Sequence, residues 1–415
     1  MTKLNDKIKI CSKCLYSSSH PLGITFNKQG ICSGCEVHEE KNILNWNYRL
    51  SELKKLVKKY KSSKNNYDCI VPVTGGNDSY FILHVVKNIL KLNPLVVCYN
   101  KYFNTKIGIK NLANLRIKFN CDILFQNINQ NSVKRITRHT LMEHGNIYWP
   151  ILAGQTSFPV QTSIKFKIPL IIWGAHQGLE QVGMFSHLHE VEMTRRYRED
   201  HDLFGNDENS LVCLDNDLKE EDVWQYRYPK LNDIRANGTR GIYLGNFIRW
   251  DPAKQHKMMV SKYNYTPSIF KRTFDTYDHT DCYNFMNLHD YLKLCKHGYS
   301  KVTDHVCREI RHKRIKKDLG ISIVKFYESR KPEHLKLFCD WLGITEKSLN
   351  FVIDRFKNKK FWLMNDLNKW SFKGVSIYLK TNKNKKNYSG LKNIIFKKGK
   401  PFNKKDKYTF FGKGI

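Results

Sequence analysis

The sequence lacks several features that would assign it to common protein classes. It has no run of about 18 or more uncharged apolar residues, so we expect no membrane-spanning helix. Residues 1–9 lack the apolar core of a secretory signal, which favours a cytoplasmic location. Alanine is scarce, and acidic residues are few, with 38 Asp and Glu against 71 Lys and Arg. The chain also has no internal repeat and no Gly-x-x-x-x-Gly-Lys-Ser/Thr phosphate loop.

The formal net charge of +33 raises the question of a nucleic-acid partner. The lysines, however, are scattered and accompany abundant Asn, Ile, Tyr and Phe, a composition typical of an AT-rich genome. The exception is the segment 379–415, which carries twelve lysines and the single acid Asp406. Such a tail can bind acidic surfaces or remain a solvated appendage, and we favour the appendage. A nucleic-acid partner is therefore not expected.

The most informative stretch is Val-Pro-Val-Thr-Gly-Gly-Asn-Asp-Ser at residues 71–79. An apolar strand predicted over Tyr67–Val73 leads through two glycines into an amphipathic helix predicted over Asp78–Leu92. Glycines let the backbone turn tightly and present N–H groups to an anion, and the helix adds its positive end. Ser79 can donate its hydroxyl to a phosphate oxygen, and Asp78 can hold Mg²⁺ or cap the helix. This order of parts predicts a phosphate-binding loop rather than an ordinary turn.

Two Cys-x-x-Cys pairs near the N-terminus predict a metal site. The four cysteines are Cys11, Cys14, Cys32 and Cys35, and seventeen residues separate the pairs. A hairpin predicted over residues 23–31 would bring the pairs together. Four thiolates complete a tetrahedral shell, so we expect a structural zinc ion without an open catalytic position. An iron–sulfur centre is the alternative.

The central part of the chain alternates between strands and helices, which predicts an α/β fold with a doubly wound parallel sheet. Strands are predicted over Tyr67–Val73, Leu95–Tyr99, Asp122–Phe125 and Pro169–Trp173. A helix over Leu44–Tyr60 precedes them, and helices over Asp78–Leu92, Lys106–Phe119, Ser132–His144 and Gln155–Lys165 follow them. Ligands would bind beyond the carboxyl ends of the strands. The polar segment 180–217 has no clear assignment.

Beyond residue 250 the pattern becomes helical. Helices are predicted over Ala253–Lys262, Phe285–Cys295, Asp304–Lys317, Pro332–Leu342 and Glu346–Asn358. We therefore expect four units: a zinc knuckle or ribbon with a linking helix (1–60), the α/β domain (61–250), a helical region for substrate or partner (251–358) and a basic tail (359–415).

The loop resembles the Ser-Gly-Gly-x-Asp-Ser loop of the PP-loop ATP pyrophosphatases, which cleave ATP to AMP and pyrophosphate. Thr74 stands where that family usually has Ser, and Asn77 fills a variable position that is often Lys. The resemblance implies an adenine nucleotide alpha-hydrolase-like fold that uses ATP and Mg²⁺, with Asp78 and Ser79 as catalytic residues. It implies that ATP is bound by Thr74, Gly75, Gly76, Asn77, Asp78 and Ser79.

Over roughly residues 10–356 the chain is similar to the N-acetyl sugar amidotransferases of bacterial surface-glycan pathways. The shared strings, in order, include His20-Pro-Leu-Gly-Ile24, Tyr102-Phe-Asn-Thr105, Phe158-Pro-Val-Gln161, Trp250-Asp251, and Thr303-Asp-His305 with Glu309-Ile-Arg311. These enzymes act in lipopolysaccharide O-antigen assembly and in making acetamidino forms of pseudaminic or legionaminic acid. The resemblance implies ATP-dependent conversion of an acetamido group of a sugar or nucleotide sugar to an acetamidino group.

In the implied reaction, the amide oxygen attacks the α-phosphate of ATP, pyrophosphate leaves, and ammonia then displaces AMP. The source of ammonia is a separate question. Position 2 is Thr, whereas a class II glutaminase needs a mature N-terminal Cys, and no convincing class I nucleophile is visible. We therefore expect a separate glutaminase subunit, with a cyclase-like barrel subunit by analogy with the family.

Candidate substrate residues are Glu180, which follows a strand end, and Asp304, His305 and Arg311 on a predicted helix. Asp304 and Arg311 lie seven residues apart, so they share a helix face. An arginine suits a diphosphate or a carboxylate, although a solvated charged face is the alternative. The rival function is a PP-loop tRNA-modifying enzyme, which adenylates a base carbonyl before thiolation or amination. A non-catalytic zinc-knuckle nucleic-acid binder would leave the Gly-Gly-x-Asp-Ser loop unexplained.

Overall fold

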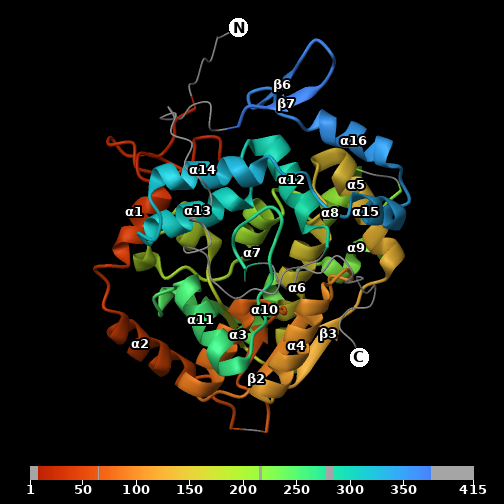
Figure 1. Cartoon of the computed structure of the whole chain (residues 1–415). Helices are drawn as coiled ribbons and strands as arrows, with labels where there is room; N and C mark the ends of the chain where they lie inside the picture. Colours follow the sequence, from red (N-terminus) through yellow and green to blue (C-terminus); the bar gives the residue numbers. More distant parts are fainter. Residues whose placement is uncertain (1–7, 64, 215–216, 277, 279–283, 375–415) are drawn as a thin grey trace.

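A parallel five-stranded sheet lies in the lower half of the molecule in the view of Figure 1. The structure is a computed structural model, which describes residues 8–374 apart from 64, 215–216, 277 and 279–283. The strands of the sheet are β1 (Cys69–Pro72), β2 (Pro94–Tyr99), β3 (Ile123–Gln126), β4 (Leu170–Trp173) and β5 (Arg240–Tyr243). They lie in the order β3-β2-β1-β4-β5, all parallel. The order reverses between β1 and β4, which is the switch point where doubly wound folds bind ligands. The predicted fold class is confirmed.

Helices cover both faces of this sheet. They are α3 (Asn77–Leu83), which runs on as the π-helix η1 (His84–Ile89), α4 (Lys106–Phe119), α5 (Gln130–His144) and α6 (Trp149–Phe166). Thr105 caps α4 by accepting a hydrogen bond from the Gly108 amide, and Asn120 ends it in the left-handed region. Helix α6 begins six residues before its predicted start because Pro150 occupies its first turn, where a missing N–H costs nothing.

The segment that had no assignment folds into short helical turns between β4 and β5. These are η2 (Gly178–Val182), η3 (His187–His189), α7 (Arg195–Tyr197), η4 (Arg198–Asp202), α8 (Glu208–Leu214), α9 (Glu220–Val223), η5 (Trp224–Tyr226) and α10 (Leu231–Asn237). Strand β5 follows, and η6 (Leu244–Asn246) comes after it. Strand β5, which is only four residues long, is absent from the strands predicted from the sequence.

The N-terminal part holds α1 (Ser33–Glu40) and α2 (Trp46–Lys58), and the C-terminal part is helical as predicted. Its helices are α11 (Pro252–Tyr263), α12 (Met286–His297), α13 (Lys301–Arg311), α14 (Lys317–Glu328), α15 (Leu335–Leu342) and α16 (Glu346–Arg355). The single helix predicted over residues 304–317 is wrong, because the chain turns at Lys313, with φ of 58°, between α13 and α14. An antiparallel pair, β6 (Trp362–Met364) and β7 (Trp370–Phe372), lies at the start of the predicted tail. Residues 375–415 lie outside the described part of the chain.

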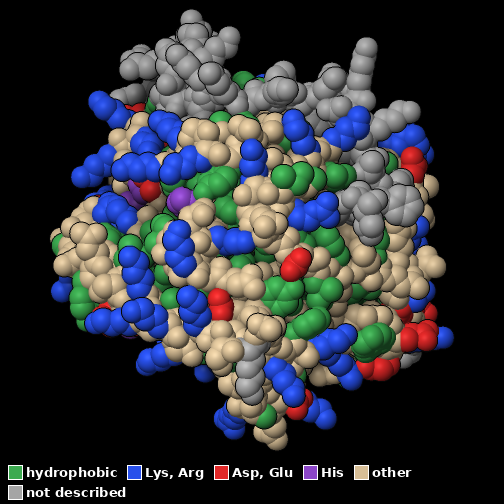
Figure 2. Space-filling model, turned by 90° about the horizontal axis from the view of Figure 1, so that it is seen from below, with side chains coloured by type: hydrophobic (Ala, Val, Ile, Leu, Met, Phe, Trp, Pro, Cys, Tyr) green, Lys and Arg blue, Asp and Glu red, His purple; other side chains and the backbone are tan. Residues whose placement is uncertain are grey.

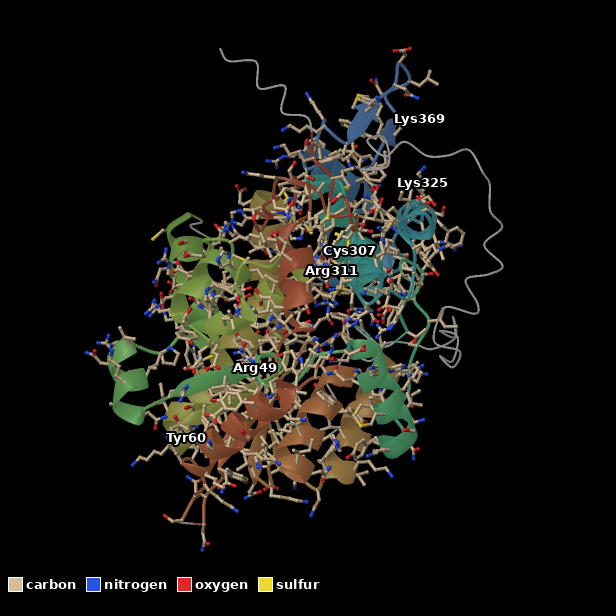
Figure 3. All side chains as sticks on the ribbon, turned by 90° about the vertical axis from the view of Figure 1, so that its left-hand side faces the viewer. Arg49, Tyr60, Cys307, Arg311, Lys325 and Lys369 are labelled. Carbon is tan, nitrogen blue, oxygen red and sulfur yellow. The ribbon has the colours of Figure 1, made fainter. Side chains whose placement is uncertain are left out.

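The N-terminal part packs with the C-terminal helices rather than standing apart. The four cysteines share one hydrophobic core with residues of α12 to α16, whereas separate clusters fill the two faces of the sheet. Figures 1 and 3 show α1 beside α13, which is far from it in sequence. This packing brings the metal-binding motif close to the helical region.

Basic side chains are spread over the molecular surface, as the composition predicts. On the face shown in Figure 2, Lys and Arg side chains are spread among apolar and neutral surface rather than gathered into one patch. No helix of the described residues combines the length and the apolar character needed to cross a membrane.

Candidate active site and metal centre

The predicted phosphate-binding loop lies between β1 and α3. The Ser79 hydroxyl accepts a hydrogen bond from the Thr74 amide at 2.8 Å, and the Thr74 hydroxyl accepts one from the Gly76 amide at 3.1 Å. These bonds fix the loop around the start of α3, for which Gly76 is the N-cap without a side-chain capping bond. Asn77 is buried, and its amide group has no hydrogen-bond partner. The loop therefore has the strand–turn–helix geometry that the sequence predicts.

A cavity of about 220 Å³, which we call the loop cavity, opens beside this loop. Its lining comes from the carboxyl ends of β1, β2 and β4 and from α3 and α6. The lining residues are Pro72, Val73, Thr74, Asp78, Ser79, Ile82, Val97, Tyr99, Gln155, Phe158, Pro159, Trp173, Gly174 and Ala175. The cavity is thus apolar at one side and polar at the loop, the usual character of a small-molecule site.

A second cavity of about 200 Å³, the junction cavity, meets the loop cavity at Asp78 and Ala175. All four predicted substrate residues line it, although Glu180 is more than 120 positions from α13. They are Glu180, Asp304, His305 and Arg311. The alternative of a solvated charged face is wrong, because on α13 Asp304, His305, Glu309 and Arg311 are all buried.

Asp78 lies where the two cavities meet. Its side chain is exposed to the cleft that the two cavities form, while protein atoms surround the carboxyl group and partly desolvate it. This burial, assisted by the nearby Asp278 carboxylate, raises the pKa of Asp78 to about 7, against the opposing effect of Arg308. Near neutral pH, therefore, the carboxyl group is balanced between its two protonation states.

Helix α13 presents a dense network of charges to the junction cavity. Asp304 accepts hydrogen bonds from Tyr16 Oη at 2.8 Å and Lys293 Nζ at 2.7 Å. Although burial opposes ionisation, Lys293 and Lys301 hold the pKa of Asp304 well below its usual range. The His305 ring bonds Thr273 Oγ1 at 2.6 Å through Nδ1 and Asp278 Oδ2 at 2.8 Å through Nε2.

A group of possible metal ligands lies in this network. Oxygen or nitrogen atoms of Asp275, Asp278 and His305 lie within 4.8 Å of one another. The Arg308 guanidinium, however, already pairs with Asp275 and lies 3.8 Å from Asp278. The group is therefore largely neutralised by protein charges.

Glu180 is held by a buried lysine. Lys41 Nζ lies 2.5 Å from Glu180 Oε2, and it also donates to the Trp250 carbonyl at 3.2 Å. The Lys41 side chain is 1% exposed and that of Glu180 is 14% exposed. Lys41 follows α1, so this ion pair ties the N-terminal part to the cleft wall.

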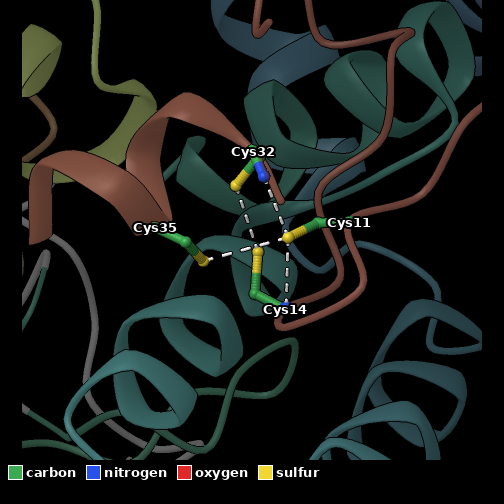
Figure 4. A group of neighbouring side chains, drawn as sticks. All are labelled: Cys11, Cys14, Cys32 and Cys35. Carbon is green, nitrogen blue, oxygen red and sulfur yellow. Dashed lines mark hydrogen bonds between the residues drawn. The ribbon is translucent and has the colours of Figure 1, made fainter. Parts of the chain in front are cut away.

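The four cysteines predicted to bind metal converge, as Figure 4 shows. An isolated bridge between Phe26 and Cys32 confirms the hairpin that joins the two pairs. The sulfur atoms lie 3.9 Å apart for Cys11 and Cys35 and 3.6 Å apart for Cys14 and Cys32. A tetrahedral ion with metal–sulfur bonds of about 2.3 Å would place its sulfurs about 3.8 Å apart. The amides of Cys14 and Cys32 donate to the Cys11 sulfur, as expected for a thiolate ligand.

Arg311 lies between this cluster and the cleft, and Figure 3 shows it beside Cys307. Its guanidinium donates to Cys32 Sγ at 3.7 Å and to the Gln181 carbonyl at 2.6 Å, and it lies over the Tyr16 ring. Asp304 also contacts Tyr16, so the two residues share the helix face that their spacing predicts. Gly34 allows this approach, because a Cβ there would lie 2.3 Å from the Arg311 guanidinium.

A third cavity of about 310 Å³ adjoins the other two, and sequence reasoning missed it. We call it the lysine cavity. It shares Gln155 with the loop cavity and Gln177, Gln181, Lys301 and Asp304 with the junction cavity. Its further residues include His20, Tyr148, Asp202, His289, Asp290, Lys293, Lys296, His297 and Tyr299. Lys293 and Lys296, three residues apart on one helix, were the sequence signal that could have indicated this cavity, but the same spacing is also common on solvated helix faces.

Comparison with known proteins gives one family and a few distant likenesses. Residues 254–375 match the family model for the C-terminal domain of WbpG-like lipopolysaccharide biosynthesis proteins. The uncharacterized protein MJ1599 of Methanocaldococcus jannaschii is 28% identical over 117 residues, which are 28% of this chain and 42% of that protein. The chain therefore spans less than half the length of this curated relative.

Two solved structures share low similarity with the chain. The NH3-dependent NAD synthetase of Campylobacter jejuni is 12% identical with a TM-score of 0.28, over 47% of this chain and 95% of that one. The U34-tRNA thiolase NcsA of Methanococcus maripaludis, with its [4Fe-4S] cluster, is 13% identical with a TM-score of 0.28, over 90% and 97%. The family match spans most of α11 and all elements from α12 to β7, and it follows the loop and cysteine motifs in the order that the sequence predicts. It confirms the predicted resemblance for this part of the chain: residues 254–375 are similar to the C-terminal domain of WbpG-like proteins of lipopolysaccharide biosynthesis.

Proposed function

We propose that the protein is an ATP-dependent amidotransferase that converts an acetamido group of a sugar or nucleotide sugar to an acetamidino group, forming AMP and pyrophosphate. The observation that carries this proposal is the position of Asp78. It lines both the loop cavity and the junction cavity, so a nucleotide in the first and an acceptor in the second would meet at one residue. Bringing two reactants together in this way supplies much of the rate enhancement in group transfer.

The loop cavity suits ATP. Its apolar wall, which includes Phe158 and Trp173, would hold the adenosine, and the Thr74–Ser79 loop would hold the phosphates. Asn77 brings no charge where relatives often have Lys. Lys301 and Arg308 of α13 line the junction cavity together with Asp78 and would supply cationic groups near the phosphates. Asp78 would hold Mg²⁺, which neutralises the charge of the leaving pyrophosphate.

The chemistry divides into two displacements. A lone pair of the amide oxygen forms a bond to the α-phosphorus of ATP, and the bond from that phosphorus to the bridging oxygen breaks, releasing pyrophosphate. Ammonia then adds to the imidoyl carbon, a proton is lost, and the carbon–oxygen bond breaks to release AMP. The residues of the cleft orient the acceptor and exclude water, which would otherwise regenerate the amide.

We assign a structural zinc ion to Cys11, Cys14, Cys32 and Cys35. The sulfur separations of 3.6 and 3.9 Å support a single tetrahedral ion, since a cluster of several irons needs its thiolates further apart. With four sulfur ligands, the ion has no open position for substrate. Its contribution would be to hold α1 and the hairpin against α13.

Ammonia would come from a separate glutaminase subunit, assisted by a cyclase-like barrel subunit. This part of the proposal follows from the sequence, in which we find no glutaminase nucleophile. Free ammonia is expected to replace the partner at high concentration, because it is the true nucleophile.

The test incubates the full chain with ATP, Mg²⁺, ammonium and an N-acetylated nucleotide sugar, and follows AMP, pyrophosphate and amidine together. We expect the three products in equal amounts. Asp78→Asn and Ser79→Ala should abolish all three while the circular dichroism spectrum is unchanged. Formation of ADP, or adenylation of tRNA instead of the sugar, would refute the proposal.

A further inference from the structure

The lysine cavity contains a cation whose charge the protein does not balance. Lys293 and Lys296 both line it from α12. Lys293 is neutralised, because its ammonium lies 2.7 Å from Asp304 and 4.2 Å from the centre of the Tyr299 ring. Lys296 donates to the His144 carbonyl at 3.0 Å. Within the described ranges, no carboxylate lies within 4.0 Å of the Lys296 ammonium.

The other charged groups of this cavity do not serve as its counter-ion. Asp290 pairs with Arg272 at 2.7 Å, and Asp304 pairs with Lys293. Burial raises the pKa of Asp202 to about 7, so this group carries only part of a charge at neutral pH. Burial lowers the pKa of His297 to about 4, so its ring is neutral. Lys301, which also lines the cavity, lies 4.0 Å from Asp278. Among the lysines of this cavity, Lys296 is therefore the one with no carboxylate of the described residues within 4.0 Å.

Partial burial of an ammonium group without an anion is unfavourable. Consistent with this, burial lowers the pKa of Lys296 to about 8. The group is still mainly protonated at neutral pH. An anionic ligand would supply the counter-ion that the Lys296 ammonium lacks and would offset the cost of its burial.

The remaining walls suit a sugar. The rings of His20 and Tyr299 stack with centroids 5.0 Å apart, and those of Tyr148 and His289 stack at 4.7 Å. The amide side chains of Gln155, Gln177 and Gln181 lie where this cavity joins the other two. Flat rings pack against the C–H faces of a sugar, and amides bond hydroxyl and acetamido groups. The volume of about 310 Å³ is that of a small-ligand site.

We propose that the lysine cavity is the acceptor subsite for an anionic sugar, in which Lys296 binds a carboxylate or phosphate of the acceptor. The acetamido group of the same acceptor would then reach past Gln177 and Gln181 into the junction cavity, toward Asp78. This inference rests on the proposed function, since it specifies the acceptor of that reaction. A carboxylate and a phosphate would both bring the negative charge that Lys296 binds, and the experiment distinguishes between these two groups.

The experiment measures binding of four probes to the full chain by calorimetry. The probes are UDP-N-acetylglucosamine, N-acetylglucosamine 1-phosphate, N-acetylneuraminic acid and neutral N-acetylglucosamine. We expect at least one anionic probe to bind roughly tenfold or more tightly than the neutral sugar, as a charged hydrogen bond predicts. Whether the phosphates or the carboxylate bind better identifies the source of the charge.

Variants of the lysine complete the test. Lys296→Met should weaken the anionic probes roughly tenfold or more and leave the neutral sugar unchanged, whereas Lys296→Arg, which keeps the charge, should retain binding. Lys325→Met, on the exposed surface of α14, is the matched control and should change nothing. Equal affinities for neutral and anionic probes, or normal anion binding by Lys296→Met, would overturn the inference. ATP is titrated separately: failure of the unaltered protein to bind ATP would refute the proposed function, whereas normal ATP binding by Lys296→Met locates any defect in the acceptor subsite.

Discussion

The Arg311 guanidinium lies 3.7 Å from the Cys32 sulfur, so one side chain joins the four-cysteine cluster to the wall of the cleft. The same group donates to the carbonyl oxygens of Glu180 and Gln181, which belong to η2. Four thiolates around a divalent cation would carry a net negative charge, which the buried Arg311 guanidinium would compensate. Besides its predicted role toward the substrate, Arg311 would thus stabilise a metal ion bound by the four cysteines.

Loss of this guanidinium should weaken metal binding. Groups that hydrogen-bond metal ligands typically change metal affinity by about 10- to 100-fold. We expect Arg311→Gln to release its metal to a chromogenic chelator roughly tenfold faster than the unaltered protein. Lys317→Gln is the control, because Lys317 bonds the carbonyls of Cys11 and Ser12 but no sulfur. Equal release rates for the two variants would show that Arg311 does not act on the cluster.

The metal itself is expected to be zinc, at about one ion per chain, because four thiolates complete its shell. Cys35→Ser should lower both the zinc content and the thermal unfolding midpoint, since metal binding supplies folding free energy. Cys213 is exposed, and Cys213→Ser should change neither quantity. Elemental analysis and thermal unfolding measure both effects. A brown protein that contains iron would contradict the zinc assignment.

Local features of this fold could be predicted from the sequence, because the residues that determine each of them are close together in the chain. The strand before Thr74, the glycine turn and the helix after it are neighbours in the chain, so their pattern predicts the loop directly. Helix α4 has its predicted bounds because Thr105 and Asn120 mark its ends. The two cysteine pairs converge because a short hairpin joins them.

Features that depend on distant residues could not be predicted in this way. Lys313 adopts a left-handed conformation without glycine or asparagine to signal it, so α13 and α14 look like one helix. The ion pair of Lys41 with Glu180 spans 139 positions, and the spacing of Lys296 equally suits a solvated face. The lysine cavity exists only once α12 comes together with α6, η2 and α13, because residues of all four helices line it.

Ionisation of Asp78 should control ATP binding. The pKa of Asp78 is raised to about 7, mainly by burial, and only the ionised carboxylate holds Mg²⁺ well. Lowering the pH from 8 to 6 protonates the group, so the affinity for ATP in the presence of Mg²⁺ should fall roughly tenfold. Asp78→Asn cannot ionise, and its weaker affinity should depend little on pH. Calorimetric titrations across this range measure both proteins, and the same slope in the variant would assign the pH dependence to another group.

The buried ion pair of Lys41 and Glu180 should matter for stability. Lys41→Met leaves the Glu180 carboxylate largely buried without its partner, which should cost about 3 kcal/mol of unfolding free energy. The double variant Lys41→Met with Glu180→Leu should recover part of this loss, because no uncompensated charge remains. Lys13 pairs with Glu39 at the surface, with side chains 47% and 46% exposed, so Lys13→Met should cost less than about 1 kcal/mol. Urea unfolding compares the variants, and equal losses for Lys41→Met and Lys13→Met would exclude a stabilising role for the buried pair.

The nitrogen source gives the most direct test of how this protein works with others. The proposed imidoyl-adenylate needs ammonia, and we find no glutaminase nucleophile in the sequence. We therefore expect the chain alone to form amidine with high ammonium and ATP, but not with glutamine. Addition of the glutaminase partner should restore the use of glutamine, and a partner whose nucleophilic cysteine is replaced by alanine should not. Nitrogen-15 from labelled glutamine should then appear in the amidine, as mass spectrometry of the product can show. Efficient glutamine hydrolysis by the chain alone would mean that a glutaminase site lies within this sequence and that the division of labour proposed for the two subunits is wrong.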